Sequence, residues 1–91
     1  WLRNVELAKE RVKTRVKEGG HDVEEVVIER RYIRGIVNLF DLFLPLVDDA
    51  MIFDNSEGLP LLIAEKNQNE ALSILKQDLF IKLREQYESA K

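Results

Sequence analysis

One long apolar stripe constrains the fold of this chain more than any other feature. Its members recur at helical spacing and are Val26, Ile33, Val37, Phe40 and Leu44. Pro45 ends or kinks that helix, because proline lacks the amide hydrogen that a continuing helix needs. The pattern therefore predicts a long amphipathic helix over residues 23–44, which needs a partner for its apolar face.

A first helix, over residues 4–18, is predicted just before this long one. Asn4 can cap it, and valine and alanine side chains then follow at helical spacing. Gly19 and Gly20 stop it, since glycine readily takes the left-handed conformation found at helix ends. Asp22 can cap the long helix, with Glu25 three residues later in a box-like pattern. Residues 19–22 are thus a short turn between two helices.

Two short apolar runs follow the long helix and predict strands over residues 50–56 and 60–65. Glu57 and Gly58 between them indicate a turn. The first run is apolar almost throughout, which is typical of a strand buried on both faces of a larger sheet. A last helix is predicted over 69–89 from the spacing of Leu72, Leu75, Leu79, Leu83 and Tyr87. The fold class is mostly α with a small β-hairpin, an α+β arrangement.

The composition excludes several classes of protein. The chain has 91 residues, 45% of them hydrophobic, and no cysteine, so we expect one domain without disulfides or a thiolate metal site. The longest apolar run, residues 42–47, is far too short to span a membrane, and no signal-peptide pattern is present. We expect a cytoplasmic location. The chain opens with Trp1 rather than methionine, which indicates a fragment or a processed product.

The basic residues are concentrated early in the chain. Residues 1–35 hold nine Lys and Arg against seven Asp and Glu, whereas residues 36–75 hold one lysine against seven acids. The acids interleaved with the early basic residues, and the lack of stacking aromatics there, argue against nucleic acid as a partner. Tyr32, Phe40 and Phe43 fit a core better than a base-stacking surface.

Two sets of arginines flank the glycine turn. Arg11 and Arg15 are four residues apart, so they share one face of the first helix, as Arg30 and Arg34 do on the second. Guanidinium groups bind phosphate oxygens through a planar fork, so converging arginines could bind a polyphosphate. The alternative is that they pair with glutamates on solvated helix faces, in this case Glu10, Glu18, Glu25 and Glu29.

Residues 5 to 65 carry a combination of motifs: an arginine-valine repeat, "GGHDV", an arginine-rich helix, "NLFDLFLPLVD" and "DNS". In this combination the chain resembles the C-terminal half of the zeta-toxin-like predicted ATPases, a P-loop kinase-like family. The resemblance implies the C-terminal part of a three-layer α/β fold. It also implies ATP-dependent phosphorylation of a small molecule by the parent protein, with ATP and magnesium as its cofactors.

The resemblance also implies roles for individual residues. Nucleotide binding would fall to seven of them: Arg11, Arg15, His21, Arg30, Asp54, Asn55 and Ser56. The residues expected to stabilise the transferring phosphate are Arg15, Arg31 and Arg34. Gly19 to Asp22 would form a short lid. His21 also fits a second role, as a residue bonded to local backbone where the helix starts, and a lone histidine makes no metal site.

The chain departs from the family because it lacks the P-loop. The P-loop pattern GxxxxGK[ST], which supplies the phosphate-binding amides, the lysine and the magnesium-binding hydroxyl, occurs nowhere in the 91 residues. We therefore expect no catalysis and no bound cofactor from this chain alone, and a missing N-terminal P-loop half as its partner. The competing hypothesis is a non-enzymatic helical interaction module, and either hypothesis allows self-association through exposed apolar surface.

Overall fold

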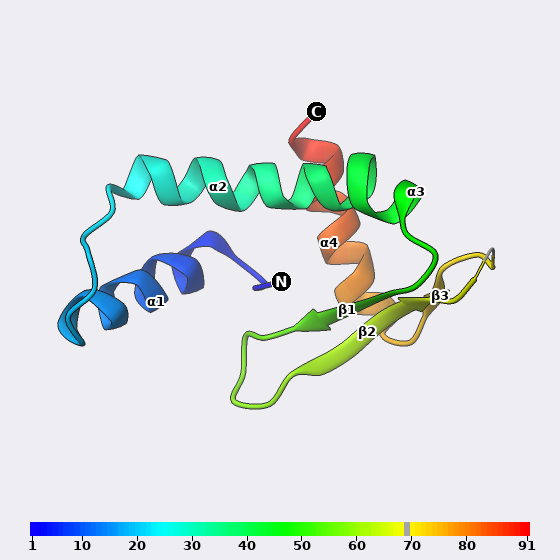
Figure 1. The fold of residues 1–91 in the computed structure, drawn as a ribbon, viewed down its shortest axis with the longest axis horizontal. Helices are drawn as coiled ribbons and strands as arrows, with labels where there is room; N and C mark the ends of the chain where they lie inside the picture. Colours follow the sequence, from blue (N-terminus) through cyan, green and yellow to red (C-terminus); the bar gives the residue numbers. More distant parts are fainter. Residues whose placement is uncertain (69) are drawn as a thin grey trace.

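The computed structural model describes residues 1–68 and 70–91 and has an α+β architecture. In chain order its elements are α1 (Val5–Lys17), α2 (Glu25–Asn38), the π-helical turn η1 (Leu39–Phe43), α3 (Leu44–Leu46), β1 (Ala50–Asp54), β2 (Leu61–Lys66), β3 (Ser73–Ile74) and α4 (Gln77–Ser89). Helix α2 lies across the top of Figure 1 and the sheet lies below it. Helix α4 runs between them and packs on both α2 and β2, while α1 lies beneath the amino-terminal half of α2.

Helix α1 begins and ends where its sequence predicts. The side chain of Asn4 accepts a hydrogen bond of 3.0 Å from Leu7 N–H, which caps the helix. At the other end Gly19 has a φ of 101°, and the amides of Gly19 and Gly20 donate to the carbonyls of Val16 and Arg15. This pair of bonds is a Schellman motif, so the glycine stop is confirmed.

Helix α2 differs from its prediction at both ends. The predicted cap at Asp22 is wrong, because that carboxylate accepts from the adjacent Val23 N–H at 2.9 Å, and the helix begins at Glu25 after a cap residue, Glu24, with no side-chain hydrogen bond. At its carboxyl end the helix continues through η1 and α3 to Leu46. The wider π-turn ends at Phe43, two residues before Pro45, whose ring would clash with a carbonyl of a regular α-helix.

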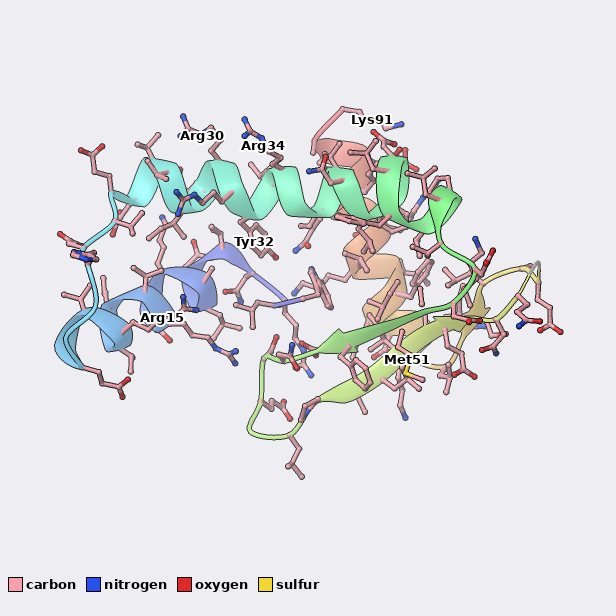
Figure 2. The ribbon with its side chains drawn as sticks, viewed as in Figure 1. Arg15, Arg30, Tyr32, Arg34, Met51 and Lys91 are labelled. Carbon is pink, nitrogen blue, oxygen red and sulfur yellow. The ribbon has the colours of Figure 1, made fainter. Side chains whose placement is uncertain are left out.

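Strands β1 and β2 form the predicted antiparallel hairpin, which has a bulge between Ile52 and Phe53. The prediction that β1 is buried on both faces is wrong: Ile52 is 5% exposed, whereas Met51 is 65% exposed. Met51 lies below the sheet in Figure 2, on the face away from α2 and α4. The helices therefore cover one face of this sheet, and the side chains of β1 alternate in burial as in an ordinary antiparallel strand.

The predicted C-terminal helix is shorter than its apolar spacing indicates. Ser73–Ile74 pairs with β2 as a third strand, and α4 begins only at Gln77. The predicted helix start, residue 69, lies outside the described residues. Within α4, Leu83 and Tyr87 are buried, but Leu75 precedes the helix and is exposed.

The core lies where α2, α4 and the sheet meet. Its buried members are Ile36, Ile52, Ile63, Ala64, Leu83 and Tyr87. Phe40 packs against it, with its ring centre 4.6 Å from that of Tyr87 and 6.2 Å from that of Phe80. The core interpretation of Tyr32 and Phe40 is therefore confirmed, whereas Phe43 is 59% exposed. No helix among the described residues is both long and apolar enough to cross a bilayer.

Candidate functional site at the end of strand β1

The carboxyl end of β1 carries a buried carboxylate. Asp54 is 2% exposed, and its Oδ2 accepts a hydrogen bond of 2.6 Å from Arg3 Nε. Its Oδ1 accepts from the Ser56 amide at 3.0 Å and from the Ser56 hydroxyl. Burial alone would raise the pKa of Asp54, but the hydrogen bonds from Ser56 and Arg3 outweigh it and hold the pKa below the ordinary 3.8. Asp54 is therefore an anion that fixes the turn after β1.

The first three residues of the chain lie against this strand end. Trp1 N–H donates to Phe53 O at 3.0 Å, and the amide of Asn55 donates to Trp1 O at 2.8 Å. The amide of Arg3 donates to Ser56 Oγ at 2.8 Å. The segment from Trp1 to Arg3 therefore runs beside the segment from Asp54 to Ser56, in the same direction.

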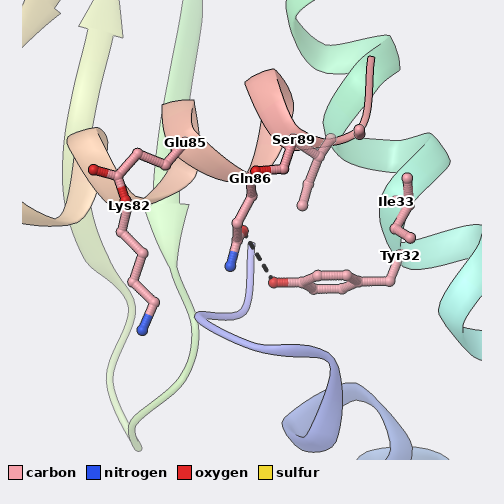
Figure 3. Close-up of a pocket in the computed structure, with 8 residues that line it drawn as sticks. Tyr32, Ile33, Lys82, Glu85, Gln86 and Ser89 are labelled. Atoms are coloured by element: carbon pink, nitrogen blue, oxygen red, sulfur yellow. Dashed lines mark hydrogen bonds between the residues drawn. The ribbon is translucent and has the colours of Figure 1, made fainter.

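A single amide side chain of α4 holds the same segment from the other side. Gln86 Nε2 donates to Arg3 O at 2.8 Å, and its Oε1 accepts from Trp1 Nε1 at 3.0 Å. The hydroxyl of Tyr32 lies 2.6 Å from Leu2 O and 3.2 Å from Gln86 Oε1. Gln86 and Tyr32 lie in a concavity of about 410 Å³ between α2 and α4, shown in Figure 3. The polar atoms of Gln86 and Tyr32 are bonded to residues 1–3, so these two side chains stabilise the strand end.

A guanidinium group from α1 reaches the same strand end. Arg11 Nη2 donates to the carbonyl oxygen of Asn55, the first residue after β1. Arg15 lies one helical turn further along the same face of α1 and is exposed. Four predicted site residues, Arg11 and Asp54 to Ser56, are thus brought together.

The other predicted site residues lie elsewhere. His21 is exposed in the turn between α1 and α2. In Figure 2 the side chains of Arg30 and Arg34 point away from α1, from the opposite side of α2. Arg31 borders a groove with Trp1 and Leu2. Arg15 and Arg34 therefore do not lie together, because Arg34 points away from α1.

The predicted pairing of these arginines with glutamates is also absent. Within residues 1–68 and 70–91, none of Arg11, Arg15, Arg30, Arg31 and Arg34 forms an ion pair within 4.0 Å. The glutamates of α2 pair instead with Lys9 of α1, whose Nζ lies 2.6 Å from Glu29 and 3.9 Å from Glu25. The arginines are therefore solvated rather than paired.

Sequence reasoning missed three residues of this site: Trp1, Arg3 and Gln86. Each acts through a contact across more than 50 positions of the chain, and none belongs to a motif or a periodic pattern. The neighbouring Asn4 had a local signal only because capping involves residues a few positions apart.

No three His, Cys, Asp or Glu side chains in the described part of the chain are grouped so as to hold a metal ion. No protein-family model, curated protein or solved structure matches the chain. The chemistry of the site thus has to be inferred from the guanidinium of Arg11 and the fixed turn after β1.

Proposed function

We propose that this chain is the C-terminal, lid-bearing portion of an ATP-dependent small-molecule kinase of the zeta-toxin-like type, acting in the cytoplasm. The P-loop, which these 91 residues lack, would come from a further polypeptide segment. ATP and magnesium would bind only in the combined protein. The chain by itself would not be catalytic.

The observation that carries this proposal is the contact of Arg11 with Asn55 at the carboxyl end of β1. In the open α/β sheet that the combined protein would have, ligands would bind at the carboxyl ends of the strands. A guanidinium has five N–H donors, and one of those on Arg11 is engaged with the carbonyl of Asn55. The remaining donors of this exposed side chain are free to bind phosphate oxygens, for which the planar fork is well suited.

The proposed lid, Gly19 to Asp22, joins α1, the helical arm that carries Arg11, to α2. Helix α1 has no buried residue. Among the described helices and strands, α2 is the one with which it makes extensive contact. The Gly19 turn joins the two helices. Movement of this arm could carry Arg11 and Arg15 toward or away from a nucleotide at the strand end, and lid movements of this kind are common in phosphoryl-transfer enzymes. Arg31 and Arg34 would act from α2 in the combined protein.

A titration with inorganic tripolyphosphate, followed by NMR of the backbone amides and the arginine Nε groups, tests the proposal. We expect weak, millimolar binding that shifts the signals of Arg11, Arg15, Asn55 and Ser56, because the P-loop amides are missing. Arg11→Ala should abolish these shifts. Lys13→Ala is the matched control: it removes one positive charge from the opposite side of the same helix and should leave them intact.

Two results would refute a phosphate site at the end of β1. One is a titration with no shift in these residues up to several millimolar. The other is equal loss of binding in Arg11→Ala and Lys13→Ala, which would show attraction by net charge alone. Micromolar binding of ATP to this chain would contradict the division of the site between two segments.

The second candidate function is a non-enzymatic helical module that associates with another copy of the chain. The observation that favours it is the outer face of α2, where Val26 is 62% and Ile33 48% exposed. Light scattering should then show a dimer that Val26→Glu with Ile33→Glu converts to a monomer. A monomer at high concentration in the unaltered chain would remove this candidate.

A further inference from the structure

Trp1 bonds to the outer edge of β1 in the pattern of a parallel strand. Its nitrogen donates to Phe53 O and its carbonyl accepts from Asn55 N–H, so one residue bridges the two residues on either side of Asp54. This is how neighbouring strands of a parallel sheet bond. The contact of Arg3 N with Ser56 Oγ confirms the direction, since the partner number rises along the chain. In Figure 1 the chain leaves its N-terminus in the direction in which the β1 arrow points.

Strand β2 pairs with the other edge of β1. In the described structure, Trp1 is the residue that forms backbone bonds to the outer edge. In an extended strand the N–H and C=O groups of one residue point to the same edge. Because Phe53 O faces Trp1, Phe53 N–H faces this edge as well, as do the polar backbone groups of Met51 two residues earlier. Such groups are a template for a further strand.

We propose that the free edge of β1 accepts one more strand, which leads into Trp1 from its amino-terminal side and runs parallel to β1. This strand rests on the proposed function in one respect: it would attach the segment that completes the phosphate site to β1. The hydrogen-bond geometry that carries it does not involve a nucleotide.

The register of the added strand follows from that of Trp1. Trp1 lies opposite Asp54, so the second residue before Trp1 lies opposite Ile52. Its N–H donates to Met51 O, and its carbonyl accepts from Phe53 N–H. The residue directly before Trp1 points its N–H away from β1. Hydrogen bonding to β1 therefore alternates along the added strand.

An apolar groove lies next to Trp1, on the helix side of the sheet. It has a volume of about 450 Å³ and is lined by Trp1 and Leu2 on one side and by α2 and η1 on the other, with Ile36, Leu39 and Phe43 among the lining residues. Phe43 is 59% exposed there. Side chains on the same face of the added strand as Trp1 would enter this groove. The second and fourth residues before Trp1 are thus expected to be apolar.

The test is the full 91-residue chain extended before Trp1 by the five residues Thr-Val-Thr-Val-Thr, which place valine at the second and fourth positions. We expect hydrogen exchange of the Phe53 amide to slow by about tenfold or more relative to the chain without the extension, since that amide gains a partner. The amide of Glu57, beyond the added strand, is the internal control and should not change.

Two proline variants of the extension test the register. Proline at the second position before Trp1 removes the N–H that bonds Met51 O, and should return exchange at Phe53 to its rate without the extension. Proline at the first position removes an N–H that points outward, and should keep most of the protection. Unchanged exchange at Phe53 in the extended chain, or equal effects of the two prolines, would overturn the proposal. Neither result would alter the tripolyphosphate titration, which tests the proposed function separately.

Discussion

The strand end and the arginine arm lie side by side but are held in different ways. Asp54 and residues 1–3 are tied to β1, α2 and α4 by hydrogen bonds between residues 30 to 83 positions apart. Helix α1 has no buried residue, and its Lys9 is bonded to Glu29 of α2. The same sequence thus builds a strand end held by buried hydrogen bonds and an exposed helix that brings Arg11 to it.

The largest expected effect separates the core from the arm. Leu83 is fully buried, so Leu83→Ala should lower the free energy of unfolding by about 2–5 kcal/mol, enough to unfold much of so small a protein. Val12 of α1 is only partly buried, and Val12→Ala should cost under about 1 kcal/mol. Urea denaturation of both variants checks this. Similar losses of unfolding free energy in the two variants would contradict the distinction between the core and α1.

The next effect concerns the buried carboxylate. Arg3→Ala leaves Asp54 buried without its guanidinium and should cost about 2 kcal/mol, since hydrogen bonds to charged groups are worth about 1.5–3 kcal/mol and Arg3 is partly exposed. Arg34→Ala, the control on α2, should change stability by less than about 0.5 kcal/mol. If the two variants have the same midpoint in urea, Arg3 does not stabilise the strand end.

Features that depend on residues close together in the chain could be predicted from the sequence, whereas long-range contacts could not. The Asn4 cap, the Gly19 stop and the hairpin were predictable, because each depends on residues close together in the chain. The link between Arg3 and Asp54 was not, since nothing local distinguishes Arg3 from an exposed arginine.

The errors have the same origin. The apolar run in β1 predicts burial on both faces, but Met51 remains exposed because no element of the described structure covers its face. The strand Ser73–Ile74 interrupts a regular leucine spacing because it pairs with β2, a tertiary contact that helical periodicity does not report. At the site, Arg11 and Asp54 to Ser56 were predicted together from the family resemblance, whereas the position of Arg30 and Arg34 on the opposite side of α2 required the fold.

Acid should weaken the strand end specifically. The pKa of Asp54 is lowered in the folded protein, so its stabilising effect is complete above the unfolded value of 3.8 and is lost as the pH falls through the lower folded value. The free energy of unfolding should therefore drop below about pH 3.8, and Asp54→Asn should show a shallower drop. Urea titrations of both proteins between about pH 2 and 6 measure this. Parallel pH profiles would mean that Asp54 has an ordinary pKa.

Two glycine substitutions give smaller effects of opposite sign. Gly19 has a φ of 101°, so Gly19→Ala should cost about 1 kcal/mol. A methyl group at Gly35, within α2, would meet no atom within 4 Å, so Gly35→Ala should stabilise the protein by about 0.5–1 kcal/mol. Thermal unfolding distinguishes them by the direction of the shift. A stabilising Gly19→Ala would place the corner in a different conformation.

Native-state hydrogen exchange tests the central contrast, a fixed strand end served by a loosely attached arm, most directly. Amides of α1, such as that of Val12, should exchange through local openings of low free energy, whereas those of Ile63 and Leu83 should exchange only on global unfolding. That result would mean that the helix carrying Arg11 opens independently of the site. Equal opening free energies across α1, β2 and α4 would show one cooperative unit and contradict the proposal that α1 moves with the lid.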